Sequence, residues 1–175
     1  MTEPKQQPAQ GNAFWNFSLA IYASKQVQQA CLELQDGSGV DVNVMLYVLW
    51  LATHGQTLSD SETSAILSVV DAWKSDVVVP LRTARRNLKS PPAAFASADA
   101  EALRTLVKKA ELEAERQQQA TLHGLRPVAG KVAAEAAIAA AAANLEAYGR
   151  SLSRRLAPEP CDVILSAFRA LLEKG

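Results

Sequence analysis

The 175-residue sequence has little cysteine, little histidine and no excess of charge of either sign. Its two cysteines, Cys31 and Cys161, lie far apart, at a spacing that indicates neither a disulfide framework nor a zinc site. Both are therefore predicted to be buried, reduced thiols. The 18 basic residues balance the 18 acidic ones, so the overall charge favours neither nucleic acid nor an acidic substrate.

Long hydrophobic runs are also missing. The longest strongly apolar stretch, residues 42–52, is too short to cross a bilayer, and residues 1–12 are polar without the apolar core of a signal peptide. We therefore expect a soluble, cytoplasmic protein with no membrane partner. Because residues 1–12 are rich in Pro and Gln and have no apolar periodicity, they are expected to form a disordered tail.

What the sequence does contain is helical periodicity. Apolar residues recur at three- and four-residue steps over 13–34 (with a turn near Ser24), 42–53, 61–73, 77–88, 98–122, 127–156 and 162–174. Asn12, Asp41 and Ser59 precede three of these segments as expected caps, Ser59 with Glu62 in a capping box. The alternation typical of strands does not persist, so the predicted fold class is all-α, a compact bundle of about five to seven helices.

Prolines mark the predicted boundaries. VVVP at 77–80 is expected to continue or restart a helix with Pro80 in its first turn, and Pro158 and Pro160 are expected to stop one. SPPAAFAS at 90–97 is predicted to be a Pro-rich corner between a helical region, 13–89, and an alanine-rich helical region, 98–175. The two regions are expected to pack together as one domain.

Two apolar patterns in the second region predict packing surfaces. The long segment 98–122 carries an apolar stripe expected to face the core: Leu103, Leu106, Val107, Ala110 and Ala114. In segment 127–156, Ile138, Leu145 and Leu152 recur every seven residues among alanines, a spacing typical of closely packed helix pairs. This seam could form within the chain or in a homodimer.

Residues suited to catalysis or metal binding are few. His54 and His123 stand beside Gly55 and Gly124 at predicted helix ends, where an imidazole interacts favourably with the helix dipole. GLRPVAGKV at 124–132 has the wrong spacing for a phosphate loop, and residues 36–47 have the wrong ligands for a calcium loop. We therefore expect no metal and no cofactor, and catalytic activity is the less favoured hypothesis.

A polar loop between two apolar helices, residues 35–43, is the strongest candidate for a binding site. Its polar side chains and the neighbouring aromatic ones form the predicted binding set: Trp15, Tyr22, Gln35, Asp36, Asp41, Asn43, Tyr47 and Trp50. In one interpretation the polar groups cap and lock the helix pair. In the other, the aromatic residues, with Phe14, rim a pocket for a ligand or a partner.

Four cations, Arg82, Arg85, Arg86 and Lys89, form a predicted basic face near the end of segment 77–88, joined by Arg150, Arg154 and Arg155. The simplest interpretation is a solvated face with cations near helix C-termini. The alternative, a patch for phosphate or RNA, lacks the interleaved aromatic residues of single-strand binders.

The sequence also resembles a known family. FWNFSLAIY at 14–22 and VQQACLELQDGSGVDVNVMLYVLWL at 27–51 resemble the N-terminal pattern of DUF2390, a proteobacterial family. The matching positions are Trp15, Phe17, Ser18, Tyr22, Cys31, Leu34, Gln35, Asp36, Gly39, Asp41, Asn43, Leu49 and Trp50. The resemblance covers about the first half of the chain and implies no activity or cofactor. It makes Gln35, Asp36, Asp41 and Asn43 the positions to test.

These observations favour a protein-interaction or adaptor module that binds another protein through the surface around residues 14–50. The first alternative is a small-molecule binder or enzyme that uses Asp36, Asp41 and Asn43, which requires these side chains to point into a cavity. The second is nucleic-acid binding through the basic face, which requires an affinity that falls steeply with salt.

Overall fold

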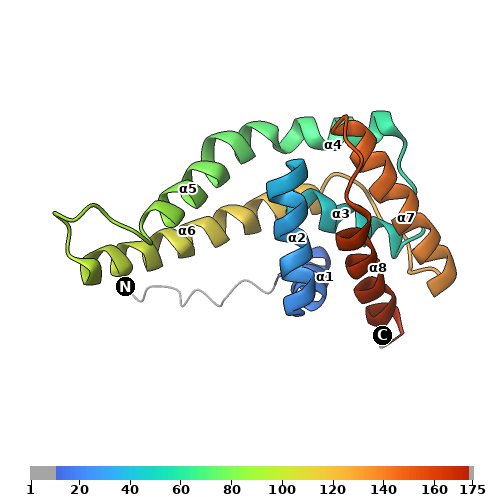
Figure 1. Ribbon diagram of the computed structural model, residues 1–175. Helices are drawn as coiled ribbons and strands as arrows, with labels where there is room; N and C mark the ends of the chain where they lie inside the picture. The colour runs from blue at the N-terminus through green and yellow to red at the C-terminus, as the bar shows by residue number, and fades with distance from the viewer. Residues whose placement is uncertain (1–10, 174–175) are drawn as a thin grey trace, which may run out of the picture.

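The computed structural model describes residues 11–173, and this range contains helices and no strand. The elements are α1 (Ala13–Tyr22), α2 (Lys25–Ser38), α3 (Val42–Ala52), α4 (Asp60–Trp73), the π-helical segment η1 (Lys74–Val78), α5 (Val79–Asn87), α6 (Ser97–His123), α7 (Ala134–Ser151) and α8 (Pro158–Leu172). Since α4, η1 and α5 form one continuous helix, the described chain has seven helical rods, which confirms the all-α prediction (Figure 1). The predicted tail falls outside the described residues, apart from 11 and 12.

The first two helices begin and end where their local signals predict. The Asn12 carboxamide oxygen accepts a hydrogen bond from the Trp15 backbone N–H at 2.8 Å, which caps α1. The predicted turn near Ser24 separates α1 from α2. Gly39, with φ +70°, closes α2 in the left-handed conformation that glycine adopts without strain.

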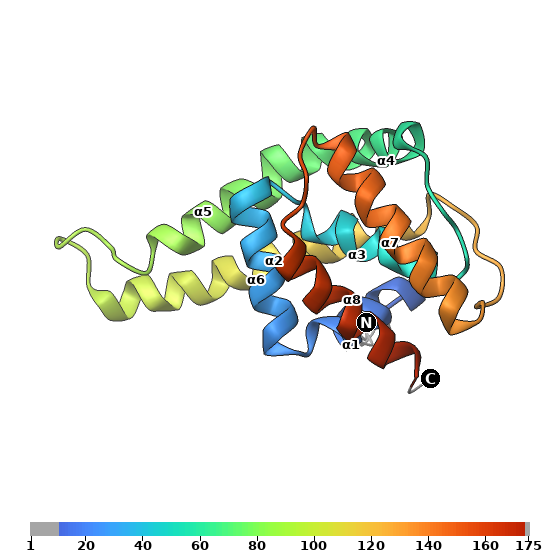
Figure 2. The ribbon, with the colours of Figure 1, turned by 45° about the vertical axis from the view of Figure 1, so that its right-hand side comes forward.

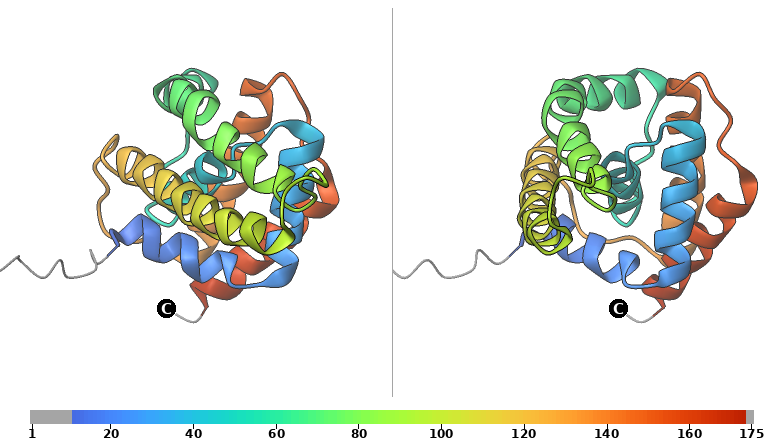
Figure 3. Two further views of the ribbon diagram at one scale, coloured as in Figure 1. Left: turned by 90° about the vertical axis from the view of Figure 1, so that its left-hand side faces the viewer. Right: turned by 60° about the vertical axis from the view of Figure 1, so that its left-hand side comes forward.

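Helix α3 lies at the centre of the molecule. Every residue from Asn43 to Ala52 is buried, because the helix is apolar around nearly its whole circumference. Helices α1, α6 and α7 all contact it, and Figure 3 shows α3 enclosed by the surrounding helices. This confirms the prediction that this segment is central to the core.

The long helix α4–η1–α5 contains one wide turn. It starts at the predicted capping box, in which Ser59 Oγ accepts the Glu62 N–H and the Glu62 carboxylate accepts the Ser59 N–H. The Val79 N–H bonds five residues back to the Lys74 carbonyl, directly before Pro80. In a regular helix the Pro80 ring would collide with the carbonyl four residues earlier, so the wide turn lets the helix continue.

Helices α5 and α6 form an arm that projects from the body of the molecule. They run side by side, and the segment 88–96 connects them at the far end (Figures 1 and 2). This segment contains the predicted Pro-rich corner. We call α5, α6 up to residue 112 and their connection the arm.

The prediction that the apolar stripe of α6 faces the core is wrong for its two leucines. Leu103 and Leu106 are 49% and 62% exposed, whereas Glu111 and Gln118 are buried. The reason lies in α5, which contributes no buried residue and faces α6 with arginines. These arginines attract the acidic face of α6 and leave its leucines outside.

The predicted starts of the last two helices are also wrong. Helix α7 begins at Ala134 instead of 127, since the preceding segment is tied to the end of α3 by a bond from the Val132 N–H to the Thr53 carbonyl at 3.0 Å. Pro158 and Pro160, expected to stop a helix, occupy the first turn of α8. A proline fits there because N–H groups in a first turn have no partner within the helix.

The alanines of α7 pack within the chain. Ala137, Ala140 and Ala141 are buried in the core, and α7 packs against α3, where small side chains permit close approach. Leu145 is buried, and Ile138 and Leu152 pack against the same core. The seven-residue pattern therefore faces the molecule's own interior. Over residues 11–173, the structure has no helix with the length and apolarity needed to cross a membrane.

Candidate functional site: a buried polar network and a projecting arm

Four of the eight predicted binding residues are buried along α3. Asp41 caps the helix, and Asn43, Tyr47 and Trp50 follow at helical steps, with no more than 8% of each residue exposed. Their neighbours are side chains of α1 and α6. These four residues form part of the interior and present no surface to a partner.

Asp41 joins three helices through its carboxylate and backbone. Its Oδ1 accepts the N–H groups of Asn43 at 2.9 Å and Val44 at 3.3 Å, which confirms the predicted cap. Its Oδ2 accepts the Gln118 side-chain amide of α6 at 2.8 Å. The Asp41 N–H donates to the Tyr148 hydroxyl of α7 at 2.7 Å. Burial, together with the nearby Asp41 charge, raises the pKa of Tyr148, so the phenol stays protonated.

Asn43 extends this network along α6. Its amide nitrogen donates to Gln118 Oε1 at 3.2 Å, and its oxygen accepts the Gln119 amide at 2.8 Å. Both glutamines are nearly fully buried, with exposed fractions of 2% and 4%. Buried polar groups with matched partners fix the register of α3 against α6. The sequence showed these partners only as part of a run of three glutamines at 117–119.

A second buried amide, Asn144 of α7, connects α7 to α3 and to the segment that follows α3. Its oxygen accepts the Leu58 N–H at 2.8 Å, and its nitrogen donates to the carbonyls of Val48 and Gln56, each at 2.9 Å. Sequence reasoning missed this residue. Its signal was present, because Asn144 is the one polar residue within 136–145, an otherwise apolar and alanine-rich stretch.

The aromatic residues near the polar network pack against one another inside the molecule, mostly in edge-on or tilted arrangements. The Phe14 ring centroid lies 5.3 Å from that of Tyr47 and 5.6 Å from that of Trp50. Trp50 also contacts both imidazoles, with centroid distances of 5.2 Å to His54 and 5.1 Å to His123. Burial raises the pKa of Tyr47 to about 12. These aromatic side chains therefore pack α1, α3 and α6 against one another.

The other four predicted binding residues lie apart from this network. Trp15, Tyr22 and Gln35 are half-buried on α1 and α2, and Asp36 is exposed, with its carboxylate 3.3 Å from the Arg86 guanidinium. None of the three clefts described in this structure is lined by Asp36, Asp41 or Asn43. The geometry thus supports the structural-lock interpretation of the polar loop.

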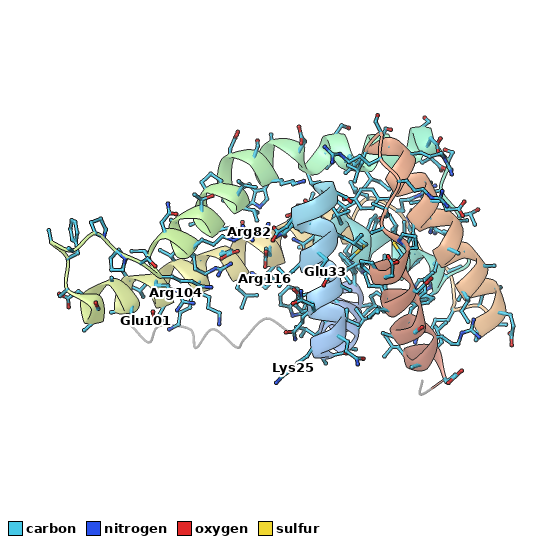
Figure 4. The ribbon with its side chains drawn as sticks, in the orientation of Figure 1. Lys25, Glu33, Arg82, Glu101, Arg104 and Arg116 are labelled. Atoms are coloured by element: carbon cyan, nitrogen blue, oxygen red, sulfur yellow. The ribbon has the colours of Figure 1, made fainter. Side chains whose placement is uncertain are left out.

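The basic face of α5 is turned largely toward α6. Arg82 bonds Glu111 at 3.1 Å and Glu115 at 2.8 Å, and Arg85 also pairs with Glu111 (Figure 4 labels Arg82). Side-chain exposure is 19% for Arg82 and 22% for Arg85, so these two do not belong to a solvated face, whereas Arg86 and Lys89 are exposed as that interpretation expects. With Arg86 paired to Asp36, only Lys89 of the predicted set has no ion-pair partner within residues 11–173.

Arg82, Arg85, Glu111 and Glu115 form a clamp between α5 and α6, and the pKa values of its two glutamates are shifted in opposite directions. Burial raises the pKa of Glu115, and the Arg82 charge offsets this only in part. Burial also acts to raise the pKa of Glu111, but hydrogen bonds from Arg85 and Arg82 outweigh it, so this pKa is lowered. The pKa shift therefore favours the ionised form of Glu111, which pairs with both Arg82 and Arg85, whereas Glu115 pairs with Arg82 alone.

The outer face of α6 carries the exposed apolar residues of the arm. Leu103, Leu106 and Leu112 are 49%, 62% and 54% exposed, and Phe95 in the connecting segment is 67% exposed. With Lys109, the leucines follow one another at three-residue steps, so neighbours in this row touch, but each step turns by about −60° and the row winds half round the helix, which places Leu103 and Leu112 on opposite sides of it. We call Leu103, Leu106, Lys109 and Leu112 the leucine row.

These features define an all-helical protein in which buried amides and carboxylates fix the core and a two-helix arm projects from it. Residues 13–122 match the model of a family described as protein of unknown function (DUF2390), and the chain belongs to this family. No curated protein and no solved structure matches the chain. The family match ends within α6, so Asn144 and Tyr148 lie beyond it.

Proposed function

We propose that this protein is a protein-interaction module whose docking surface is the arm. The observation that carries the proposal is the leucine row, since large apolar side chains gathered on a projecting helix are typical of interaction sites. In the segment 35–43, by contrast, Asp41 and Asn43 are buried and bonded within the chain. The proposed surface therefore differs from the one around residues 14–50 that the sequence favoured.

The partner we propose is an amphipathic helix of another protein with acidic residues beside its apolar face. Lys108 and Lys109 are exposed next to the leucines, and within residues 11–173 neither has a carboxylate within 4.0 Å. A helix that crosses α6 over Leu106 would place its acidic residues near the Lys109 ammonium group, one turn along α6. We propose that the binding takes place in the cytoplasm, where Cys31 and Cys161 would stay reduced.

The experiment compares the wild type with a Leu103→Ser, Leu106→Ser double variant and with Leu32→Ser as the matched control. Leu32 is exposed to 41% on α2, outside the arm. Proteins captured from a lysate of the native cells would be purified and titrated against each variant. We expect the double variant to weaken binding at least about tenfold, a loss of about 1.4 kcal/mol, and the control to leave it unchanged.

A Trp15→Ala variant tests the surface around residues 14–50 in the same titration. If it weakens binding while the double variant does not, the docking surface is the one the sequence favoured and the arm proposal is wrong. Sedimentation of the purified protein alone tests the predicted homodimer, for which α7 offers only its exposed alanines, because Ala137, Ala140 and Ala141 are buried within one chain.

A further inference from the structure

We propose that the cleft between α7 and α8 binds a small amphiphile with one anionic head group, a carboxylate or a phosphate ester, on an apolar body. The cleft has a volume of about 690 Å³, within the usual range for small-molecule sites. Residues from α7, α8 and the connection between them line it: Ala142, Leu145, Glu146, Gly149, Arg150, Ser153, Arg154, Arg155, Leu156, Pro158, Cys161 and Leu165.

The floor of the cleft is apolar. Leu145 is buried, and Leu156 and Leu165 are half-buried against the core. Burial, with a smaller contribution from the Asp162 charge, raises the pKa of the half-buried Cys161 thiol. This cysteine therefore stays protonated and contributes to the apolar wall. Such a floor suits the hydrocarbon part of a ligand and gives a fully polar ligand little to bind.

The rim of the cleft is basic. Arg150, Arg154 and Arg155 outnumber the one lining carboxylate, that of Glu146, whose side chain is 77% exposed. Across residues 11–173, Arg155 has no carboxylate within 4.0 Å. A guanidinium binds planar carboxylates and phosphates through paired N–H donors, so this rim suits an anionic head group.

The backbone that carries the rim is held in a fixed position. The Arg154 N–H bonds the Gly149 carbonyl at 3.0 Å, and the Ser153 N–H bonds the Arg150 carbonyl at 2.8 Å. Ser153 adopts φ 51°, a left-handed conformation that non-glycine residues rarely take. A Cβ at Gly149 would lie 3.0 Å from the Arg154 carbonyl, so glycine permits this close approach. Arg150 is anchored to Asp60 at 2.8 Å.

Calorimetric titration with octanoate and octyl phosphate, and with octan-1-ol as the uncharged comparison, tests the proposal. We expect the two anions to bind and the alcohol to bind at least about tenfold more weakly. An Arg154→Ala, Arg155→Ala variant should lose about tenfold in affinity for the anions. The matched control is Lys108→Ala, Lys109→Ala, which makes the same change in net charge on the arm and should bind as the wild type does.

The reactivity of Cys161 locates the ligand. Cys31 is fully buried, so a thiol reagent in a mildly alkaline native buffer, where part of the half-buried Cys161 thiol ionises, should modify Cys161 first. Octanoate at about ten times its Kd should slow this reaction about tenfold in the wild type. The proposal is overturned if neither anion binds, if octan-1-ol binds equally well, if the arginine variant behaves like the lysine control, or if Cys161 is not protected.

Co-sedimentation with phosphatidylcholine vesicles, with and without phosphatidylglycerol, identifies the source of the amphiphile. If anionic vesicles retain the wild type and not the arginine variant, the ligand is a membrane lipid. If octanoate binds and the vesicles retain neither protein, the ligand is a free amphiphile. Both results support the anionic head group, whereas equal retention of both proteins on neutral vesicles contradicts it.

Discussion

Single buried side chains, Asp41, Asn43 and Asn144, connect segments that are distant in the sequence. Asn144 alone bonds the backbone of Val48, Gln56 and Leu58. Each such hydrogen bond adds only modestly to the free energy of unfolding, but a buried polar group left without a partner lowers it by about 1–3 kcal/mol. The consequence is that conservative changes at these positions should affect stability more than their size suggests.

We expect Asn144→Ala to lower the free energy of unfolding by about 2–4 kcal/mol, because it leaves buried backbone groups without partners. Urea unfolding followed by circular dichroism measures this loss. The control is Asn87→Ala at the exposed end of α5, which should change stability by less than about 0.5 kcal/mol. Equal stability of the two variants would contradict the role assigned to the Asn144 amide.

A double-mutant cycle tests the contact between Asp41 and Gln118. Asp41→Asn keeps a capping side chain but can set two NH₂ groups against each other, and Gln118→Glu sets two carboxylates together. Each single change should destabilise the protein by about 1–3 kcal/mol. The double variant restores a donor opposite an acceptor, so it should recover at least about 1 kcal/mol, measured by thermal unfolding. Strict additivity would show that the pair is not coupled.

The sequence predicted the caps but not their long-range partners. The side chains of Asn12, Asp41 and Ser59 accept hydrogen bonds from N–H groups two or three residues ahead, so a short stretch of sequence is enough to predict these caps. Gln118 and Tyr148 lie 77 and 107 residues from Asp41, and no local pattern records such a distance. The inward direction of Asp41 and Asn43 could therefore be stated only as one of two interpretations.

Among the elements, the arm departs most from what periodicity predicts. Apolar spacing placed Leu103 and Leu106 inside, but α5 offers arginines instead of an apolar surface, and Glu111 turns toward them. Periodicity predicts that a helix is amphipathic, but it does not predict which face of the helix packs against a neighbouring helix. Charge complementarity between two helices decided the rotation of α6 here.

The ion pairs of the arm should give it a pH-dependent stability. The pKa of Glu111 is lowered from its usual 4.5, so its contribution is fully present above about pH 4.5 and is lost as the pH falls through the lowered value. Glu111→Gln should therefore lower the free energy of unfolding by about 2 kcal/mol at pH 7, and this difference should shrink toward acid pH. Urea unfolding of both proteins between pH 7 and 3 measures it.

The control for this series is Glu113→Gln, which removes an exposed partner of Arg116 in the next turn of α6 (Figure 4 labels Arg116). Because this ion pair is exposed to solvent, its loss should leave the free energy of unfolding nearly unchanged. Glu115 carries a raised pKa and contributes with the opposite sign. Because the Glu111 charge is one cause of that shift, the same comparison is repeated in a Glu115→Gln background, which removes this contribution. A difference independent of pH would contradict the assignment of the clamp to ionised Glu111.

At the scale of the whole molecule, the family segment 13–122 is not sufficient to enclose α3. Helix α7 packs on α3 and supplies Asn144 and Tyr148, yet it lies outside the matched residues. The sequence indicated the helices of both regions but could not show that the alanine-rich one completes the core of the other. That arrangement depends on contacts between residues far apart in the chain.

A chain that ends at residue 123 should therefore fail to form a fixed core. We expect it to retain helical far-UV circular dichroism, to lose the near-UV signal of its tryptophans and to bind a dye for exposed apolar surface. Co-expression with residues 124–175 as a separate polypeptide should restore the near-UV signal. Cooperative unfolding of the truncated chain alone would show that α7 and α8 are dispensable.

The position of α3 also has a consequence during synthesis. The hydrogen bond between Asp41 and Tyr148 can form only after the chain has grown by 107 residues beyond Asp41. At about 5–20 residues per second, the ribosome needs roughly 5–20 s for this. For that time the most apolar helix of the protein has left the exit tunnel without its covering helix. We therefore expect ribosome-associated chaperones to bind the nascent chain. Slow translation of the alanine-rich segment that forms α7 would prolong the exposure of α3.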